Sequence, residues 1–146
     1  MRVLLDTCVI SEIVRPAGET RVKERVGQFS REGTFLSVIT LGELAFGVAR
    51  LKPGKKQNGY SAGLLQLEQS YRERILQLDV DTALIWGEIA AARQGLGRPL
   101  GAQDGLIAAT ALRHGLHVVT RNVKDFEDTG VRICLLYTSP SPRDRG

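Results

Sequence analysis

The sequence of 146 residues has no apolar run that approaches the roughly 20 residues needed to span a membrane. Near the N-terminus the short run Val3-Leu4-Leu5 ends at Asp6, whereas a secretory signal carries an apolar region of about 7–15 residues. We therefore expect a protein that is neither exported nor membrane-bound and that acts in the cytoplasm.

Cysteine and histidine are also scarce, which excludes several kinds of site. Cys8 and Cys134 form no Cys-x-x-Cys pair, so the chain is neither a disulfide scaffold nor a typical zinc-binding protein. We expect both thiols to be reduced, small, buried residues. His114 and His117 stand on either side of Gly115 and share no helix face, and we interpret both as structural.

Nucleotide-binding glycine motifs are absent as well. The segment Gly95-x-Gly97-x-x-x-Gly101 has the wrong spacing for a dinucleotide site, and Gly54-Lys55 lacks the rest of a Walker motif. The sequence therefore offers no recognisable loop for cradling the phosphates of a nucleotide.

What is present is a globular composition, 42% hydrophobic and 25% charged. The net charge of +4 and the pI near 9.4 permit a polyanionic partner without identifying one. The length suits one domain, which we place at residues 1–136. Residues 137–146 contain two prolines, and the stretch from Cys134 to Asp144 resembles a translated sequencing adapter, so we expect 137–146 to be a disordered, artefactual tail.

Hydrophobic periodicity and turn residues predict alternating strands and helices. We expect strands at residues 3–5, 34–39, 75–80, 117–120 and 131–136. We expect helices at residues 8–14, 20–31, 40–51, 64–74, 81–94 and 102–114, a basic loop at 52–59, and a buried face of Leu84, Ile85, Ile89 and Ala92 on the fifth helix. This alternation is typical of an α/β fold with a central, mostly parallel sheet of about five strands flanked by helices.

Four acidic residues occupy positions where such a sheet binds ligands. Asp6 ends the first strand and Asp125 follows the fourth, while Glu43 and Asp104 fall in the first turns of predicted helices. Because ligands bind outside the carboxyl ends of parallel strands, the pattern favours convergence of all four acids at one edge of the sheet.

Such convergence requires a counter-charge. Two unit charges about 5 Å apart repel by roughly 3 kcal/mol at an effective dielectric constant near 20. Mg²⁺ or Mn²⁺, which prefers oxygen ligands, relieves this repulsion and can activate water against a phosphodiester. The four acids together therefore suggest a metal-assisted phosphodiester hydrolase.

Each acid also has a simpler structural interpretation. Thr40-x-x-Glu43 fits a capping box. Asp6 and Asp125 are both suited to helix starts, and Asp104 is favourable near the positive end of a helix. Only the joint pattern of the four residues points to chemistry.

Four segments, taken in order, carry a resemblance to a known family. They are Val3-Leu4-Leu5-Asp6-Thr7-x-Val9-Ile10-Ser11-Glu12, Ser37-Val38-Ile39-Thr40-x-x-Glu43-Leu44-x-x-Gly47, Asp104-x-x-Ile107-Ala108-Ala109-Thr110-Ala111 and Val119-Thr120-Arg121-Asn122-x-x-Asp125-Phe126. The chain resembles PIN-domain toxins over about residues 2–133, and it is most similar to the VapC and FitB-like branch of bacterial type II toxin–antitoxin systems.

The resemblance implies a three-layer PIN-like fold over residues 1–136 and a Mg²⁺- or Mn²⁺-dependent endoribonuclease. Such an enzyme hydrolyses RNA with a metal-activated water, is restrained by a cognate antitoxin and forms a homodimer. The implied metal-holding and catalytic residues are Asp6, Glu43, Asp104 and Asp125. The resemblance also implies four supporting residues. Thr7 and Thr120 would orient ligands or water, and Asn122 would brace the loop before Asp125. Arg98 would either meet phosphate or be an ordinary loop residue.

One departure from the family pattern supports an alternative function. The family usually has Asn after the Asp-Thr pair, and this chain has Cys8, whose thiol is a weaker hydrogen-bonding group than an amide. The alternative is a non-catalytic RNA- or partner-binding module on the same scaffold. A phosphorylated receiver domain fits less well, because it needs paired acids after the first strand and Asp6 stands alone.

Overall fold

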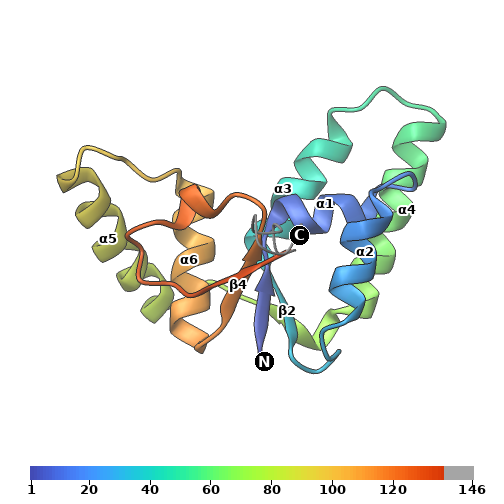
Figure 1. The fold of residues 1–146 in the computed structure, drawn as a ribbon. Helices are drawn as coiled ribbons and strands as arrows, with labels where there is room; N and C mark the ends of the chain where they lie inside the picture. The colour runs from blue at the N-terminus through green and yellow to red at the C-terminus, as the bar shows by residue number, and fades with distance from the viewer. Residues whose placement is uncertain (137–146) are drawn as a thin grey trace, which may run out of the picture.

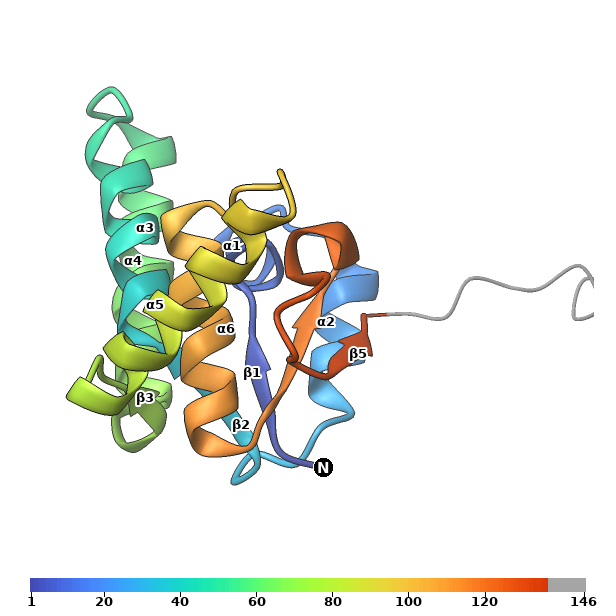
Figure 2. The same cartoon turned by 90° about the vertical axis from the view of Figure 1, so that its left-hand side faces the viewer.

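The computed structural model describes residues 1–136; the predicted tail at 137–146 lies outside the described residues. A five-stranded, wholly parallel sheet in the order β3-β2-β1-β4-β5 forms the centre of the molecule (Figures 1 and 2). The strands are β1 (Val3–Leu5), β2 (Thr34–Ser37), β3 (Ile75–Leu76), β4 (His117–Thr120) and β5 (Ile133–Leu135). The helices are α1 (Thr7–Val14), α2 (Thr20–Gly27), α3 (Val38–Ala49), α4 (Lys55–Ser70), α5 (Val80–Gly95) and α6 (Ala102–His114), with short 3₁₀ helices η1 (Arg72–Arg74) and η2 (Val123–Phe126).

The central strand β1 separates two hydrophobic cores. Successive strand residues point to opposite faces of the sheet. Val3 and Leu5 therefore pack into the core that also contains Ile10 of α1, whereas Leu4 packs into the core that contains Ile107 of α6. All of these side chains are buried, which accounts for the continuous apolar run that a central parallel strand needs.

Helices cover both faces of the sheet and complete three layers. α1, α2 and α4 lie on one side and α5 and α6 on the other (Figure 1). In both views α3 and α4 run side by side and extend beyond the carboxyl edge of the strands (Figures 1 and 2). The predicted α/β fold with a parallel five-stranded sheet is confirmed. Within residues 1–136 no helix is long and apolar enough to cross a membrane.

Two strands are shorter than predicted because side-chain caps start the following helices early. β2 ends at Ser37, whose hydroxyl accepts a hydrogen bond of 3.0 Å from the amide of Ile39, so α3 begins at residue 38 rather than 40. β3 ends at residue 76, and Asp79 caps α5 by accepting a bond of 2.8 Å from the amide of Thr82. The predicted cap at Asp81 is therefore wrong, and the alternating residues Leu78 and Val80 are exposed rather than in a strand.

Three further predictions are corrected by burial and helix length. α4 begins at Lys55, so the expected basic loop at 52–59 is mostly helix. On α5, Leu84 and Ala92 are exposed, and the face that includes Ile89 also buries Arg93. The free cysteines Cys8 and Cys134 are both partly exposed rather than buried.

The close approach of α1 and α4 depends on Gly63. A methyl group added at this position would lie 2.5 Å from the carbonyl oxygen of Val14, which is backbone and cannot swing away. We expect Gly63→Ala to lower the free energy of unfolding by about 1–3 kcal/mol, as overpacking does, measured by urea denaturation.

A matched substitution in another helix controls for the intrinsic helix propensity of alanine. Gly87 lies inside α5 with no atom within 4 Å of the added methyl position. Gly87→Ala should stabilise the protein by about 0.5–1 kcal/mol. Equal effects of the two substitutions would show that contact with Val14 does not limit the packing of α4.

Candidate functional site

The sheet topology brings the four predicted acids to one edge of the molecule. β2, β1 and β4 are neighbours and run parallel, so the segments that follow them leave from the same edge. Asp6 directly follows β1, Glu43 lies in α3 after β2, and Asp125 lies in η2 after β4. Asp104 joins them because α6 runs back towards the start of β4 and so begins at the carboxyl edge (Figure 1).

Asp6 is held from both of its carboxylate oxygens. Its side chain is 4% exposed. Oδ1 accepts a hydrogen bond of 2.8 Å from the amide of Thr7, and Oδ2 accepts bonds of 2.7 Å from Thr120 Oγ1 and 3.3 Å from Cys8 Sγ. Asp6 is thus the N-cap of α1, as the structural interpretation proposed, and it also faces β4. The thiol of Cys8 donates to Asp6 at this site, and burial is the main cause that raises the pKa of Cys8.

Thr7 links Asp6 to Glu43. The hydroxyl of Thr7 donates a bond of 2.7 Å to Glu43 Oε1 and lies 3.0 Å from the hydroxyl of Thr40. Glu43 therefore bonds a side chain of α1, and Ser37 rather than Thr40 is the N-cap of α3. The interpretation of Thr40 and Glu43 as a capping box is wrong.

Thr120 and Asn122 connect Asp6 to the segment that carries Asp125. The hydroxyl of Thr120 accepts a bond of 2.9 Å from the amide of Asn122, and the carbonyl of Asn122 accepts one of 3.1 Å from the amide of Asp125. Both of these bonds of Asn122 are made by its backbone. The segment from the end of β4 to η2 is therefore tied to the Asp6 carboxylate through one hydroxyl.

The electrostatics of Asp104 place it beside the other three acids. Its pKa is raised from the ordinary value of 3.8 to about 6. Partial burial is the largest cause, followed by repulsion from Asp125, Asp6 and Glu43, while the positive charge of Arg93 opposes the rise. The ionised form of Asp104 is thus disfavoured by the very residues that were predicted to share a metal with it.

The donor chemistry of this site fits a hard divalent cation. Among residues 1–136, no three acidic, histidine or cysteine side chains are close enough together to hold one ion. Mg²⁺ needs fewer, since it usually binds one or two carboxylates and keeps several waters. The pKa of Asp104 is raised first by burial and then by Asp125, Asp6 and Glu43, so Asp104 lies among carboxylates of the kind that such an ion binds.

Two arginines lie next to the acids in different settings. Arg98, predicted to meet phosphate, is about half exposed and forms ion pairs with Glu127 and Asp128. Arg93 is buried and bonds the backbone of the segment that carries Asp125. Sequence reasoning did not select Arg93; the available signal was its position four residues after Ile89, on the inward face of α5.

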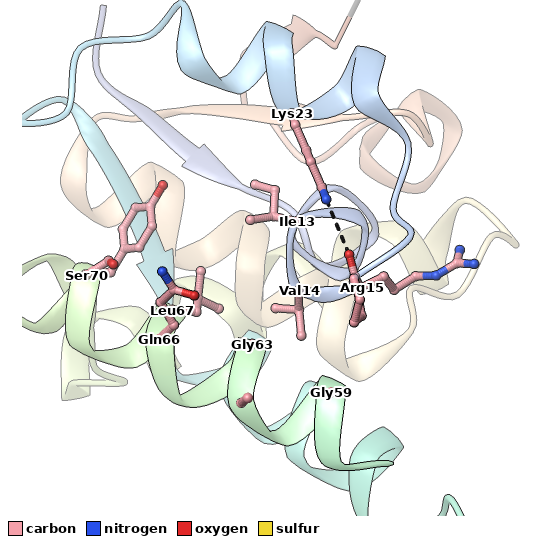
Figure 3. A pocket seen from close by; sticks show the side chains of 12 residues that line it. Ile13, Val14, Arg15, Lys23, Gly59, Gly63, Gln66, Leu67 and Ser70 are labelled. Atoms are coloured by element: carbon pink, nitrogen blue, oxygen red, sulfur yellow. Dashed lines mark hydrogen bonds between the residues drawn. The ribbon is translucent and has the colours of Figure 1, made fainter. Parts of the chain in front are cut away.

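Two cavities open near α4. One, of about 350 Å³, is lined by Thr7 and Glu43 together with apolar residues of α3 and Tyr60. The other, of about 480 Å³, lies between α1 and α4 and includes Val14 and Gly63 but none of the four acids (Figure 3). Of these two cavities, the smaller one adjoins the acidic site.

Comparison with known families agrees with this geometry. The model of the PIN domain matches residues 3–131. The chain belongs to the PIN domain family. It is 41% identical over 128 residues to Toxin FitB of Neisseria gonorrhoeae, covering 85% of this chain and 90% of that protein. It is 33% identical over 132 residues to VapC ribonuclease Y4jK of Sinorhizobium fredii, covering 90% and 94%.

Solved structures of this PIN family show the same fold. A structure described as FitAB bound to an IR36 DNA fragment superposes with a TM-score of 0.85 at 35% identity, covering 96% of this chain and 99% of that one. FitAcB from Neisseria gonorrhoeae superposes with a TM-score of 0.82 at 39% identity, covering 90% and 95%. The resemblance to VapC and FitB-like PIN-domain toxins is confirmed.

The raised pKa of Asp104 predicts a pH-dependent stability in EDTA. A carboxyl whose pKa is higher in the folded state than in the unfolded state destabilises the fold once it is ionised. Wild-type stability should therefore fall as the pH rises from about 3.8 towards the folded-state pKa of about 6. We expect Asp104→Asn to melt at a higher temperature than wild type at pH 7.5, and the gap should close towards pH 4.

Glu68→Gln serves as the charge-matched control, since Glu68 is exposed on α4 and does not contribute to the pKa of Asp104. Melting followed by circular dichroism measures all three proteins. If Asp104→Asn melts no higher than wild type at pH 7.5, Asp104 is not destabilised by its acidic neighbours.

Proposed function

We propose that this protein is a divalent-metal-dependent endoribonuclease, with residues 1–136 as a single nuclease domain, and that it acts as the toxin of a toxin–antitoxin pair. The observation that carries the proposal is the gathering of Asp6, Glu43, Asp104 and Asp125 at the carboxyl edge of the sheet, where Thr7 bonds both Asp6 and Glu43, and where burial and then the other acids raise the pKa of Asp104. Carboxylates that repel one another in a partly buried site are stabilised by a bound cation, whereas isolated, solvated capping residues do not need one. The relatives named VapC ribonuclease and Toxin FitB support the same activity.

The four acids have distinct positions in this proposal. A bound Mg²⁺ or Mn²⁺ would lower the pKa of a water molecule and neutralise charge on the scissile phosphate. Asp6, the most buried of the four, would hold the ion at the centre of the sheet edge, with Asp104 and Asp125 on the side of α6 and η2. Glu43 approaches from α3 with its carboxylate oriented by the hydroxyl of Thr7.

The supporting residues act through these carboxylates. Thr120 donates to Asp6 and fixes the direction of its free lone pairs, while the backbone of Asn122 positions the segment of Asp125. Arg98 is engaged by Glu127 and Asp128, so a contact with the RNA phosphates would require it to leave these exposed pairs, which cost little to break.

We further propose a cognate antitoxin as the partner of this protein, a homodimer as its assembly and the cytoplasm as its location. The antitoxin is supported by the relative named Toxin FitB and by the solved FitAB structure, which contains DNA. The acidic edge offers a target for a positively charged antitoxin residue, because a cation there relieves the same repulsion as the metal does.

Removal of one carboxylate charge tests the activity directly. Asp6→Asn keeps one oxygen that can accept from the amide of Thr7 and turns an NH2 donor towards the hydroxyl of Thr120, which can accept, so the fold should survive. Cleavage of RNA by the purified protein in Mg²⁺ should fall by more than the roughly 10–100-fold that the loss of an outer-shell partner costs. EDTA should abolish wild-type cleavage, and added Mg²⁺ or Mn²⁺ should restore it.

Glu68→Gln again provides the control, because it removes an exposed negative charge from α4 and should cleave like wild type. Wild-type protein that binds RNA but does not cleave it in either metal would overturn the proposal in favour of a non-catalytic RNA-binding module. Cleavage by Asp6→Asn at the wild-type rate would place the chemistry elsewhere.

A further inference from the structure

Arg93 is a buried cation that the proposed chemistry does not use. It lies in the last turn of α5 and is 7% exposed. Burying a guanidinium is costly unless hydrogen bonds and opposite charge compensate the lost hydration. The position of Arg93, on the inward face that includes Ile89, would ordinarily carry an apolar residue. The groups that the Arg93 guanidinium bonds must therefore compensate for its burial.

The guanidinium of Arg93 joins two segments that each carry an acid. Nε donates a bond of 2.8 Å to the carbonyl of Arg98, in the connector between α5 and α6. Nη1 donates bonds of 2.8 Å to the carbonyl of Glu127 and 3.5 Å to the carbonyl of Asp125. The connector leads into the first turn of α6 with Asp104, and the other two carbonyls belong to the segment of Asp125 itself.

The charge of Arg93 is also directed at the site. Within residues 1–136, every hydrogen bond that Arg93 donates ends on a backbone carbonyl, so no carboxylate neutralises it through a bonded pair. Its positive charge instead interacts favourably with the Asp104 carboxylate. One side chain thus supplies both the geometric link and a fixed counter-charge behind the two acids.

We infer that Arg93 is a positioning residue that fixes Asp104 and Asp125 relative to each other, so that this half of the metal site is formed before the ion binds. The inference rests on the proposed metal-dependent function. It separates Arg93 from Arg98, whose ion pairs with Glu127 and Asp128 are exposed and therefore contribute little to holding the segment.

Arg93→Lys tests the inference, because an ammonium is a point donor that cannot span carbonyls on two segments as a guanidinium does. We expect the Kd for Mg²⁺, measured by calorimetry well below the melting temperature, to rise by about 10–100-fold, as the loss of outer-shell partners does. The Mg²⁺ concentration for half-maximal RNA cleavage should rise in parallel.

Arg74→Lys is the matched control. Arg74 also donates to three carbonyls, those of Arg31, Thr34 and Ser70, but at the start of β2, the end of the sheet opposite the acids. This substitution should lower the melting temperature without changing the Kd for Mg²⁺.

The outcomes distinguish the inference from the function on which it rests. Wild type that binds Mg²⁺ and cleaves RNA, together with an unchanged Kd in Arg93→Lys, overturns the positioning role alone. Wild type that neither binds Mg²⁺ nor cleaves RNA overturns the proposed function and the inference with it. An equal rise of the Kd in Arg74→Lys shows a general loss of stability and also overturns the positioning role.

If Arg93→Lys does not fold, an NMR measurement on the wild-type protein tests the positioning role of Arg93. The Nε–H NMR signal of Arg93 should shift when Mg²⁺ is added. The Nε–H of Arg25, which donates 2.8 Å to the carbonyl of Leu136 beside β5, should stay in place. An Arg93 signal that does not respond to Mg²⁺ overturns the inference.

Discussion

Repulsion between carboxylates at the carboxyl edge of a parallel sheet is the constraint on which this structure depends. Parallel pairing of β2, β1 and β4 sends three chain segments out of the same edge, and α6 begins there as well. Burial and, after it, the acids gathered in this way raise the pKa of Asp104. The same sheet that is stabilised by its buried apolar strands therefore carries a local electrostatic cost, and a divalent cation is the simplest means of relieving it.

The surrounding polar groups hold the four acids in place despite their electrostatic repulsion. Asp6 is restrained by Thr7 and Thr120, and Glu43 is restrained by the same Thr7 hydroxyl. Arg93 restrains the other two acids through the backbone. The site thus has two halves. Hydroxyl groups on α1 and β4 restrain Asp6 and Glu43, and the guanidinium of Arg93, together with the bonds of Asn122, restrains the segments of Asp104 and Asp125. Fixed donors of this kind cost little reorganisation when charge changes at the site.

The sequence was sufficient to predict at which edge of the sheet the acids lie, but not where each helix begins or which groups hold the acids in place. The acids that follow strands, Asp6 and Asp125, could be assigned to the sheet edge because that rule needs only the strand positions. The caps at Ser37 and Asp79 were missed because a short polar residue that starts a helix outweighs the alternating pattern around it. The sequence could place Arg93 on the inward face of α5 but could not predict its partners, since these are backbone carbonyls five to 34 residues further along the chain.

The position of β1 at the centre of the sheet has a consequence for synthesis. Val3, Leu4 and Leu5 pair on one side with β4, whose residues lie more than a hundred positions later. Pairing over such a separation requires closing a very long loop, which is slow and must wait for the distant strand. A growing chain therefore has β1 and its neighbour β2 early but lacks the other neighbour, β4, and the segment of Asp125 until it is nearly finished. Incomplete chains therefore cannot assemble the acidic edge until translation is almost over.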